Sequence, residues 1–206
     1  MVAFLIFIVK NYMKPYLVFT GTASVGKTTL IKPLISLLEE KHKEPVKYIT
    51  EVARSLQLRG HVINKEATSR TQRLIEDEYL RLEEEYMESV RISDRSIIDR
   101  YSYAMLNGGP AIDEQKRELL DWYDKNILNQ CAKYSHIFHI PLTDDLKLEL
   151  DGVRSPDEAY RREVDRLQHH IINKYNIKVH TLSGSVEERL DLIKNAVGLR
   201  KHGFIF

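Results

Sequence analysis

The chain has 206 residues, which suits one α/β domain with a well-formed core and requires no second domain. Its 31 lysines and arginines against 30 aspartates and glutamates give a formal net charge of +1, which argues against binding duplex nucleic acid mainly by bulk electrostatics. The single cysteine, Cys131, excludes an internal disulfide and a multi-cysteine metal site. It favours a reducing, cytoplasmic setting and is expected to be a buried small hydrophobe.

The first twelve residues contain an apolar run from Val2 to Val9. Eight residues cannot span a bilayer, and the run has neither a basic residue before it nor a small-residue cleavage site after it. We therefore interpret residues 1–12 as a dispensable extension or an extra edge strand, in preference to a membrane-surface anchor. Residues 13–197 are then the domain, and residues 198–206 are a C-terminal tail.

Beyond the extension, short apolar runs alternate with longer amphipathic segments, a pattern typical of a parallel sheet covered by helices. The strands are expected at Tyr16–Thr20, Val46–Thr50, Val90–Ser93, His136–Ile140 and Ile177–Leu182. The helices are expected from the first loop to about Glu40, and over Glu66–Glu88, Ile97–Leu106, Glu114–Cys131, Glu158–Lys174 and Val186–Ala196. This order predicts a three-layer α/β/α fold with a five-stranded, mainly parallel sheet.

The composition of two further segments predicts their exposure or structure. In the long charged helix, the acidic run Glu83-Glu84-Glu85 is expected to form a solvated face. The polar stretch Thr143–Asp157 is expected to be a loop or short lid.

The stretch after the first strand carries the clearest functional signal. It fits the phosphate-loop pattern G-x-x-x-x-G-K-[ST] in a strand–loop–helix setting. Glycine at both ends lets consecutive backbone N–H groups turn inward on a polyphosphate, and the helix points its positive end at the same anion. Lys27 supplies a mobile cation and the Thr28 hydroxyl is placed to ligate Mg²⁺. The predicted nucleoside triphosphate site comprises Gly21, Thr22, Ala23, Ser24, Val25, Gly26, Lys27, Thr28 and Thr29.

The other motifs separate the classes of protein that use such a loop. A GTPase needs a guanine-reading N/T-K-x-D, and the nearest match, Asn64-Lys65, continues with Glu66-Ala67. A motor ATPase normally has a strand ending in Asp-Glu, where the second carboxylate activates water, but here the third strand ends in Asp94-Arg95. These features favour transfer to a bound acceptor over hydrolysis.

An acceptor site should lie beyond the carboxyl ends of the neighbouring strands, where ligands collect in parallel sheets. Phosphoryl transfer needs a carboxylate near the acceptor hydroxyl and cations for the migrating charge. Glu51 and Arg54 follow the second strand, Asp94 and Arg95 end the third, and Asp99 lies five residues further on. These are the candidate acceptor and catalytic residues.

At this point the chain resembles a known family, the P-loop kinases similar to the ribosylnicotinamide kinase domain of NadR-type proteins, which are grouped with AAA-type ATPases. The resemblance runs from about Tyr16 to Ile193. It rests on six motifs, which are Gly21 to Thr28, Glu51-x-Ala53-Arg54, Gln72-Arg73, Asp94-Arg95-Ser96, Asp151-Gly152-Val153-Arg154 and Gly184-Ser185-Val186-Glu187-Glu188-Arg189. The resemblance implies a P-loop kinase that transfers phosphate from ATP, with Mg²⁺, to a nucleoside-like or nucleotide-like acceptor.

The resemblance also implies roles. Glu51 would take the proton of the acceptor hydroxyl, and Asp94 would hold Mg²⁺ through water or compete for the role of base. Arg95 would stabilise the transferring phosphoryl group, and Arg154 would close over the phosphates. Gln72 would read a base edge, or else face solvent on its charged helix.

The sequence thus predicts an ATP-dependent, Mg²⁺-requiring kinase of nucleoside-type acceptors. One alternative is a kinase of polynucleotide ends or modified bases, with a groove lined by arginines of the helices that carry Arg70 to Arg73 and Arg161 to Arg166. The other is a nucleotide-dependent switch that binds a protein partner and transfers little phosphate. The acceptor, the oligomeric state and the choice of base stay open at this stage.

Overall fold

The computed structural model describes residues 14–107, 113–143 and 157–199. In this part of the chain, five strands form one parallel sheet in the order β2-β3-β1-β4-β5. They are β1 (Tyr16–Thr20), β2 (Lys47–Ile49), β3 (Arg91–Asp94), β4 (His136–His139) and β5 (His180–Thr181). All five predicted strands are confirmed, and the sheet is parallel throughout the described residues. Strands β2 and β5 are shorter than predicted.

The helices alternate with the strands as predicted, with one addition. They are α2 (Lys27–His42), α3 (Val52–Leu58), α4 (Ser69–Glu85), α5 (Ile97–Leu106), α6 (Glu114–Cys131), α7 (Glu158–Lys174) and α8 (Val186–Ala196), with a 3₁₀ turn η1 at Asn64–Glu66. The short helix α3 was not predicted. Helix α4 begins three residues later than predicted, at a Thr68 cap whose side chain accepts from the Thr71 N–H.

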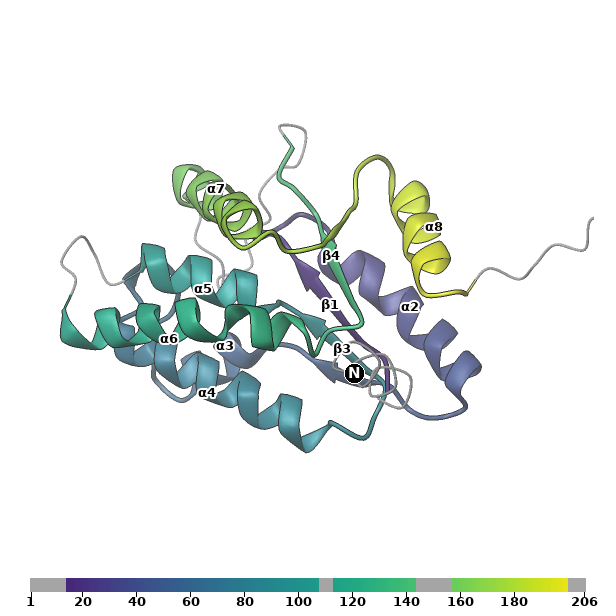
Figure 1. Ribbon diagram of the computed structural model, residues 1–206, viewed down its shortest axis with the longest axis horizontal. Coiled ribbons are helices and arrows are strands. Elements are labelled where there is room, and N and C mark those ends of the chain that lie inside the picture. Colours follow the sequence, from purple (N-terminus) through teal and green to yellow (C-terminus); the bar gives the residue numbers. More distant parts are fainter. Residues whose placement is uncertain (1–13, 108–112, 144–156, 200–206) are drawn as a thin grey trace, which may run out of the picture.

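The sheet lies between two helical layers (Figure 1). The odd and even residues of β1 face opposite ways, as the strand period of two requires. Tyr16 and Val18 join a core with α3, α4, α5, α6 and α7, whereas Leu17 and Phe19 join a core with α2 and α8. Because β1 is buried from Tyr16 to Thr20, the loop that follows it starts from a fixed position. The predicted three-layer fold is confirmed.

Three apolar residues of α6 belong to the core on one face of the sheet. Leu119, Tyr123 and Ile127 are buried, and the Cys131 thiol packs partly buried against the same core. Burial raises the pKa of this thiol to about 12, so it is neutral at physiological pH and acts as a small apolar group. None of the described helices combines the length and apolar character needed to cross a membrane.

The prediction that the acidic end of α4 is solvated is wrong for Glu83. Only 4% of this residue is exposed, and its Oε1 accepts hydrogen bonds from Tyr16 Oη at 3.1 Å and from Arg100 Nη1 at 3.3 Å. Arg100 also donates from Nε to Glu76 Oε2 at 2.8 Å. The residues Glu76, Glu83 and Arg100 therefore form a buried ionic network that ties α4 to α5. Glu84 and Glu85 are exposed, as predicted.

Some predicted segments lie outside the described residues. They are the extension at 1–12, residues 200–206 of the tail, and most of the proposed lid, including Arg154.

Candidate nucleotide and transfer site

The loop between β1 and α2 lies at the carboxyl edge of the sheet. Gly26 precedes α2 in the left-handed region, at φ 85°, and no side chain caps the helix. The first turn of α2 contains no acidic residue either. The first N–H groups of a helix have no acceptor within it and carry its positive dipole end. An uncapped helix start without a competing carboxylate is the arrangement expected for binding phosphate.

Several basic side chains donate hydrogen bonds to the carbonyl groups of this loop. Lys27 Nζ donates to the Gly21 and Thr22 carbonyl oxygens, each at 2.8 Å. Arg161 of α7 donates to the carbonyl oxygens of Ala23 at 2.9 Å and Ser24 at 3.4 Å, and Arg189 of α8 donates to that of Val25 at 3.3 Å. These bonds fix the shape of the loop through its carbonyl groups.

Gly21 is fixed by its surroundings. A Cβ at this position would lie 2.6 Å from the Ile140 carbonyl oxygen and 2.9 Å from Val25 Cγ2. The Gly21 N–H also donates to Asp99 Oδ1 at 3.2 Å. Only glycine lets the loop leave β1 this close to the end of β4.

The loop is joined to β3 through Thr28 and Asp94. The Thr28 hydroxyl donates to Asp94 Oδ2 at 3.1 Å, and Lys27 Nζ lies 3.9 Å from Asp94 Oδ1. This Oδ1 atom is buried and accepts no hydrogen bond from any residue of the described ranges. Tyr79 Oη donates to the Asp94 carbonyl oxygen at 3.4 Å, which fixes the backbone at the strand end. A hydroxyl and a carboxylate thus meet beside the lysine at the phosphate end of the loop.

Glu51 lies at the end of the next strand, β2, in a strained conformation. It precedes α3 with φ 58°, and its side chain is 60% exposed. Arg54, one turn along α3, lies 3.5 Å from Glu51 Oε2 and is also exposed. Since β2 neighbours β3 in the sheet, Glu51 and Asp94 end adjacent strands. The Glu51 carboxylate is therefore exposed at the sheet edge, beside Arg54.

Backbone strain gathers at this edge. Of the five described non-glycine residues with positive φ, Ser24, Glu51 and Arg95 follow the ends of β1, β2 and β3. Each such conformation costs about 1–3 kcal/mol and persists where the surrounding structure requires it, often at functional sites.

Tyr48, which sequence reasoning missed, faces the same region from β2. Its buried hydroxyl has no hydrogen-bond partner among the described residues. Burial, followed by the negative charges of Asp94 and Glu51, raises the pKa of Tyr48 to about 12. In a sequence, an aromatic residue within a strand is normally assigned to the core, so no local pattern identified Tyr48 as a candidate site residue.

Arg95 and Asp99 are bound to each other and to the loop. Arg95 Nη1 donates to Asp99 Oδ1 at 3.3 Å and to the Gly21 carbonyl oxygen at 3.4 Å, and the guanidinium lies over the Tyr103 ring. Asp99 is 0% exposed, and its Oδ2 accepts from the Ser96 N–H at 2.8 Å as the cap of α5. The buried Asp99 carboxylate is occupied by bonds within the protein, which argues against the predicted contact with the acceptor.

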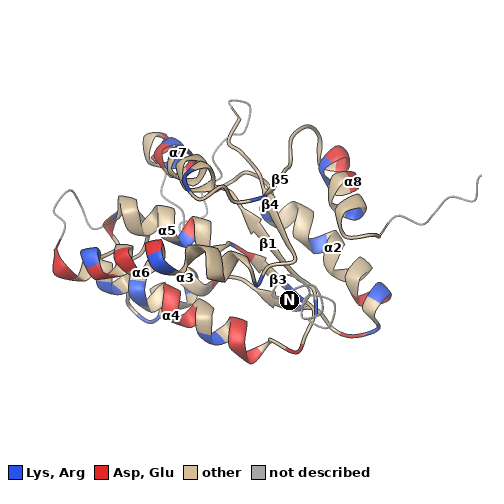
Figure 2. Cartoon of the chain, in the orientation of Figure 1, with Lys and Arg blue, Asp and Glu red and all other residues tan. Residues whose placement is uncertain are grey.

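The remaining predicted residues divide as follows. Gln72 is 4% exposed on α4, so the alternative in which it faces solvent is wrong. Arg161 holds the loop and is 2% exposed, so it cannot line an open groove. Arg73 is paired with Asp77 at 2.9 Å, and Figure 2 shows acidic and basic residues alternating along α4 and α7.

A family model described as an AAA domain matches residues 16–189. Among proteins with curated descriptions, none matches the sequence.

Solved structures share the fold. A NadR protein in complex with NR aligns with a TM-score of 0.72 and 16% identity, over 97% of this chain and 56% of that one. A NadR protein in complex with NAD and AMP-PNP aligns with a TM-score of 0.68 and 18% identity, over 94% and 52% of the two chains. Thymidylate kinase from Ehrlichia chaffeensis aligns with a TM-score of 0.59 and 16% identity, over 88% and 97%.

This chain spans about half the length of the NadR chains. At 16–18% identity, the likeness to solved structures establishes the fold alone. The family model, which matches residues 16–189, establishes the family. The chain therefore belongs to the AAA domain family, with the P-loop fold that the NadR and thymidylate kinase structures share.

Proposed function

We propose that this protein is an ATP-dependent kinase that transfers the γ-phosphoryl group to a hydroxyl or phosphate of a nucleoside-like or nucleotide-like acceptor. The observation that carries the proposal is the order of groups along one sheet edge. The phosphate loop follows β1, the Thr28–Asp94 pair ends β3, and the exposed Glu51 carboxylate ends β2. An acceptor held by Glu51 would thus face the terminal phosphate of a nucleotide in the loop.

The residues at the Thr28–Asp94 pair fit a magnesium ion. Mg²⁺ prefers oxygen ligands and keeps several waters, and the pair supplies a hydroxyl and a carboxylate whose Oδ1 accepts no described hydrogen bond. When bound, the ion would neutralise charge that develops on the phosphate oxygens. Thr28 would hold it, and Asp94 would orient its waters.

The other residues then have defined tasks. Lys27 would move from the Gly21 and Thr22 carbonyl oxygens to the outer phosphates, since its flexible chain can exchange these partners. Glu51 is proposed as the base, because Asp94 is bonded to Thr28 and only 16% exposed, whereas the Glu51 side chain beside Arg54 is 60% exposed and can be reached by an acceptor. Arg95, over the Gly21 carbonyl, would stabilise the migrating charge.

The structural neighbours support the class of acceptor. One NadR structure holds NR and another holds NAD with AMP-PNP, an ATP analogue, and the third neighbour is a thymidylate kinase. Each name or ligand refers to a nucleoside or nucleotide. We extend this class to the present chain as part of the proposal.

A polynucleotide acceptor is less well supported. The predicted groove relied on arginines of α4 and α7, but Arg73, Arg162 and Arg166 lie within salt-bridge distance of acidic neighbours. A cation paired with a carboxylate on its own helix contributes little net attraction for a phosphate backbone.

The test is a transfer screen with γ-labelled ATP and Mg²⁺ over nucleosides, including nicotinamide riboside, nucleoside monophosphates and oligonucleotides. We expect label on a nucleoside or mononucleotide, at least 100-fold less transfer by Lys27→Ala, and no change in Lys32→Ala, an exposed lysine of the same helix. Label on oligonucleotides alone would favour the polynucleotide reading. Nucleotide binding without transfer to any acceptor would overturn the kinase proposal in favour of a switch.

A further inference from the structure

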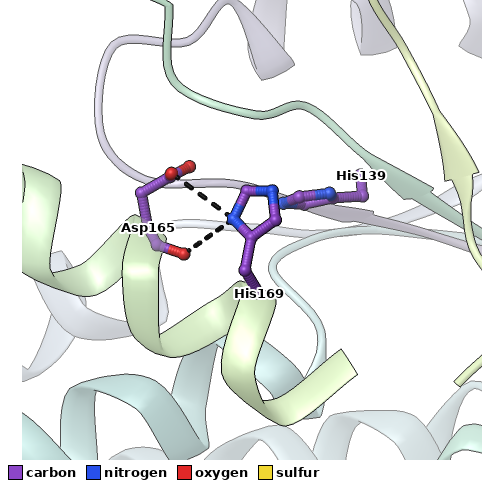
Figure 3. A group of neighbouring side chains, drawn as sticks. All are labelled: His139, Asp165 and His169. Atoms are coloured by element: carbon purple, nitrogen blue, oxygen red, sulfur yellow. Dashed lines mark hydrogen bonds and ion pairs between the residues drawn. The ribbon is translucent and has the colours of Figure 1, made fainter. Parts of the chain in front are cut away.

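Three potential metal ligands meet at a second place, beside the end of β4. His139 is the last residue of that strand, and Asp165 and His169 lie one turn apart on α7. One ligand atom from each lies within 4.8 Å of the other two. In Figure 3 the ring of His139 reaches toward the ring of His169, with Asp165 on the other side of that ring.

His139 has a buried nitrogen that lacks a partner. The residue is 2% exposed, and its Nε2 has no hydrogen-bond partner among the described residues. The His139 and His169 rings stand edge to face, with centroids 4.8 Å apart. A buried polar atom left unsatisfied in this way needs an explanation, and a bound ion is one of the recognised ones.

The His169 ring and the Asp165 carboxylate lie side by side, with His169 Nδ1 3.4 Å from Asp165 Oδ2. His169 Nδ1 donates to the Asp165 carbonyl oxygen at 3.0 Å, which leaves Nε2 as the nitrogen with the lone pair. Asp165 Oδ1 accepts from the Leu142 N–H at 2.9 Å, which fixes the carboxylate. Bonds of this kind to a backbone carbonyl and a backbone amide are those that commonly fix the tautomer and direction of ligands around a metal ion.

The donor set selects the kind of ion. Two imidazoles and one carboxylate suit Zn²⁺, which takes nitrogen and oxygen ligands at about 2.0–2.2 Å and leaves a fourth position for water. Mg²⁺ prefers oxygen ligands throughout, so this site differs in chemistry from the Thr28–Asp94 pair. Ligands of one tetrahedral zinc ion are closer than 4.8 Å, and the half-exposed His169 side chain can turn to close the set.

We propose that His139, Asp165 and His169 form a binding site for a transition-metal dication, with Zn²⁺ as the best match. The ion would join the end of β4 to α7. The same helix holds the phosphate loop through Arg161 and bonds Asp99 through Gln168 Nε2 at 3.2 Å. Metal binding at this site would therefore stabilise the side of the sheet on which the nucleotide loop rests.

The test uses the full chain, purified without a polyhistidine tag and stripped with chelator. Zn²⁺ is titrated by calorimetry, Co²⁺ is followed by its visible absorption, and thermal unfolding is measured with and without Zn²⁺. We expect one ion per chain, a Co²⁺ spectrum typical of histidine ligation, and a higher unfolding temperature with Zn²⁺.

Variants distinguish this site from adventitious binding. His169→Ala and Asp165→Asn, which change partly exposed residues, should each lower zinc affinity about 100-fold or more, because even loss of a supporting contact costs about 10–100-fold. His170→Ala, at the exposed neighbouring position, should not change it. The proposal is overturned if the stripped chain binds no zinc, or if binding survives in both variants. It is also overturned if binding is lost only in His136→Ala, since His136 and His180 form a separate surface pair 3.2 Å apart.

Discussion

Thr28 and Asp94 are joined by a 3.1 Å hydrogen bond from hydroxyl to carboxylate, although one residue starts a helix and the other ends a strand. The bond spans 66 positions of sequence and closes the phosphate loop against β3. The bond places the negative charge of Asp94 next to Lys27. In the proposed complex, a polyphosphate would replace Asp94 as the partner of Lys27, and the metal ion would replace Lys27 as the partner of Asp94. If the proposed magnesium ion binds at this pair, a change of Asp94 should affect magnesium use directly.

Asp94→Asn should therefore alter the magnesium requirement. The amide keeps the shape of the side chain but removes the charge that would orient the waters of the ion. We expect the Mg²⁺ concentration for half-maximal transfer to rise, or activity to fall, by about 10–100-fold. Magnesium titrations of the initial rate measure this. Asp121→Asn, an exposed change on α6, is the control, and an unchanged magnesium curve in Asp94→Asn would contradict the assignment.

Glu51→Gln tests the choice of base. Glutamine cannot take a proton, so transfer should fall about 100-fold or more, the typical contribution of a general base. ATP affinity, measured by calorimetry, should stay the same because Glu51 follows β2 and not the phosphate loop. Glu66→Gln, an exposed change in η1, should keep full activity. Full activity in Glu51→Gln would leave Asp94 as the remaining candidate.

Gly21→Ala tests the close approach of the loop to β4. The added methyl group would lie 2.6 Å from the Ile140 carbonyl oxygen, so the loop must move. We expect a loss of about 1–3 kcal/mol of stability and weaker ATP binding. Gly60→Ala is the matched control, because its backbone also has positive φ but a Cβ there meets nothing within 4 Å. The control should lose stability without losing nucleotide affinity, and equal affinities in the two variants would show that Gly21 is not critical.

Arg100→Met tests the buried network between α4 and α5. The substitution would leave the carboxylates of Glu76 and Glu83 buried without their cation, which typically costs about 3–5 kcal/mol. Urea unfolding measures the loss. Arg81→Met on α4 breaks the exposed pairs with Glu78 and Glu85 and should change stability little. Similar values for the two variants would mean that the buried network contributes nothing beyond surface pairing.

The sequence was sufficient for the order of elements and for the phosphate loop, because both depend on local patterns. Strand runs, helical periods and the fixed spacing from Gly21 to Thr28 are set by residues close in the chain. The carboxyl ends of adjacent parallel strands then brought Glu51 and Asp94 to one edge, as topology requires. The seven-residue helix α3 was not predicted, because two turns give too little periodicity to recognise.

The errors concern contacts between distant segments. Glu76, Tyr79 and Glu83 share one face of α4, but only the fold shows that this face is buried and that Arg100 neutralises it. Asp99 likewise reads as a candidate site residue until Ser96, Gly21 and Gln168 are seen to occupy its oxygens. A charged residue has no local signal for burial, because its partner determines whether burial is tolerated.

The central position of β1 also has a consequence for how the chain is made. Tyr16 pairs with Arg91 and Leu17 with His136, and the Arg161 contact to the Ala23 carbonyl joins residues 138 positions apart. At synthesis rates of about 5–20 residues per second, the phosphate motif is made on the order of 10 s before the arginines that bond to its carbonyl groups. A nascent chain thus carries the complete motif before α7 and α8, whose arginines hold the loop, have been made.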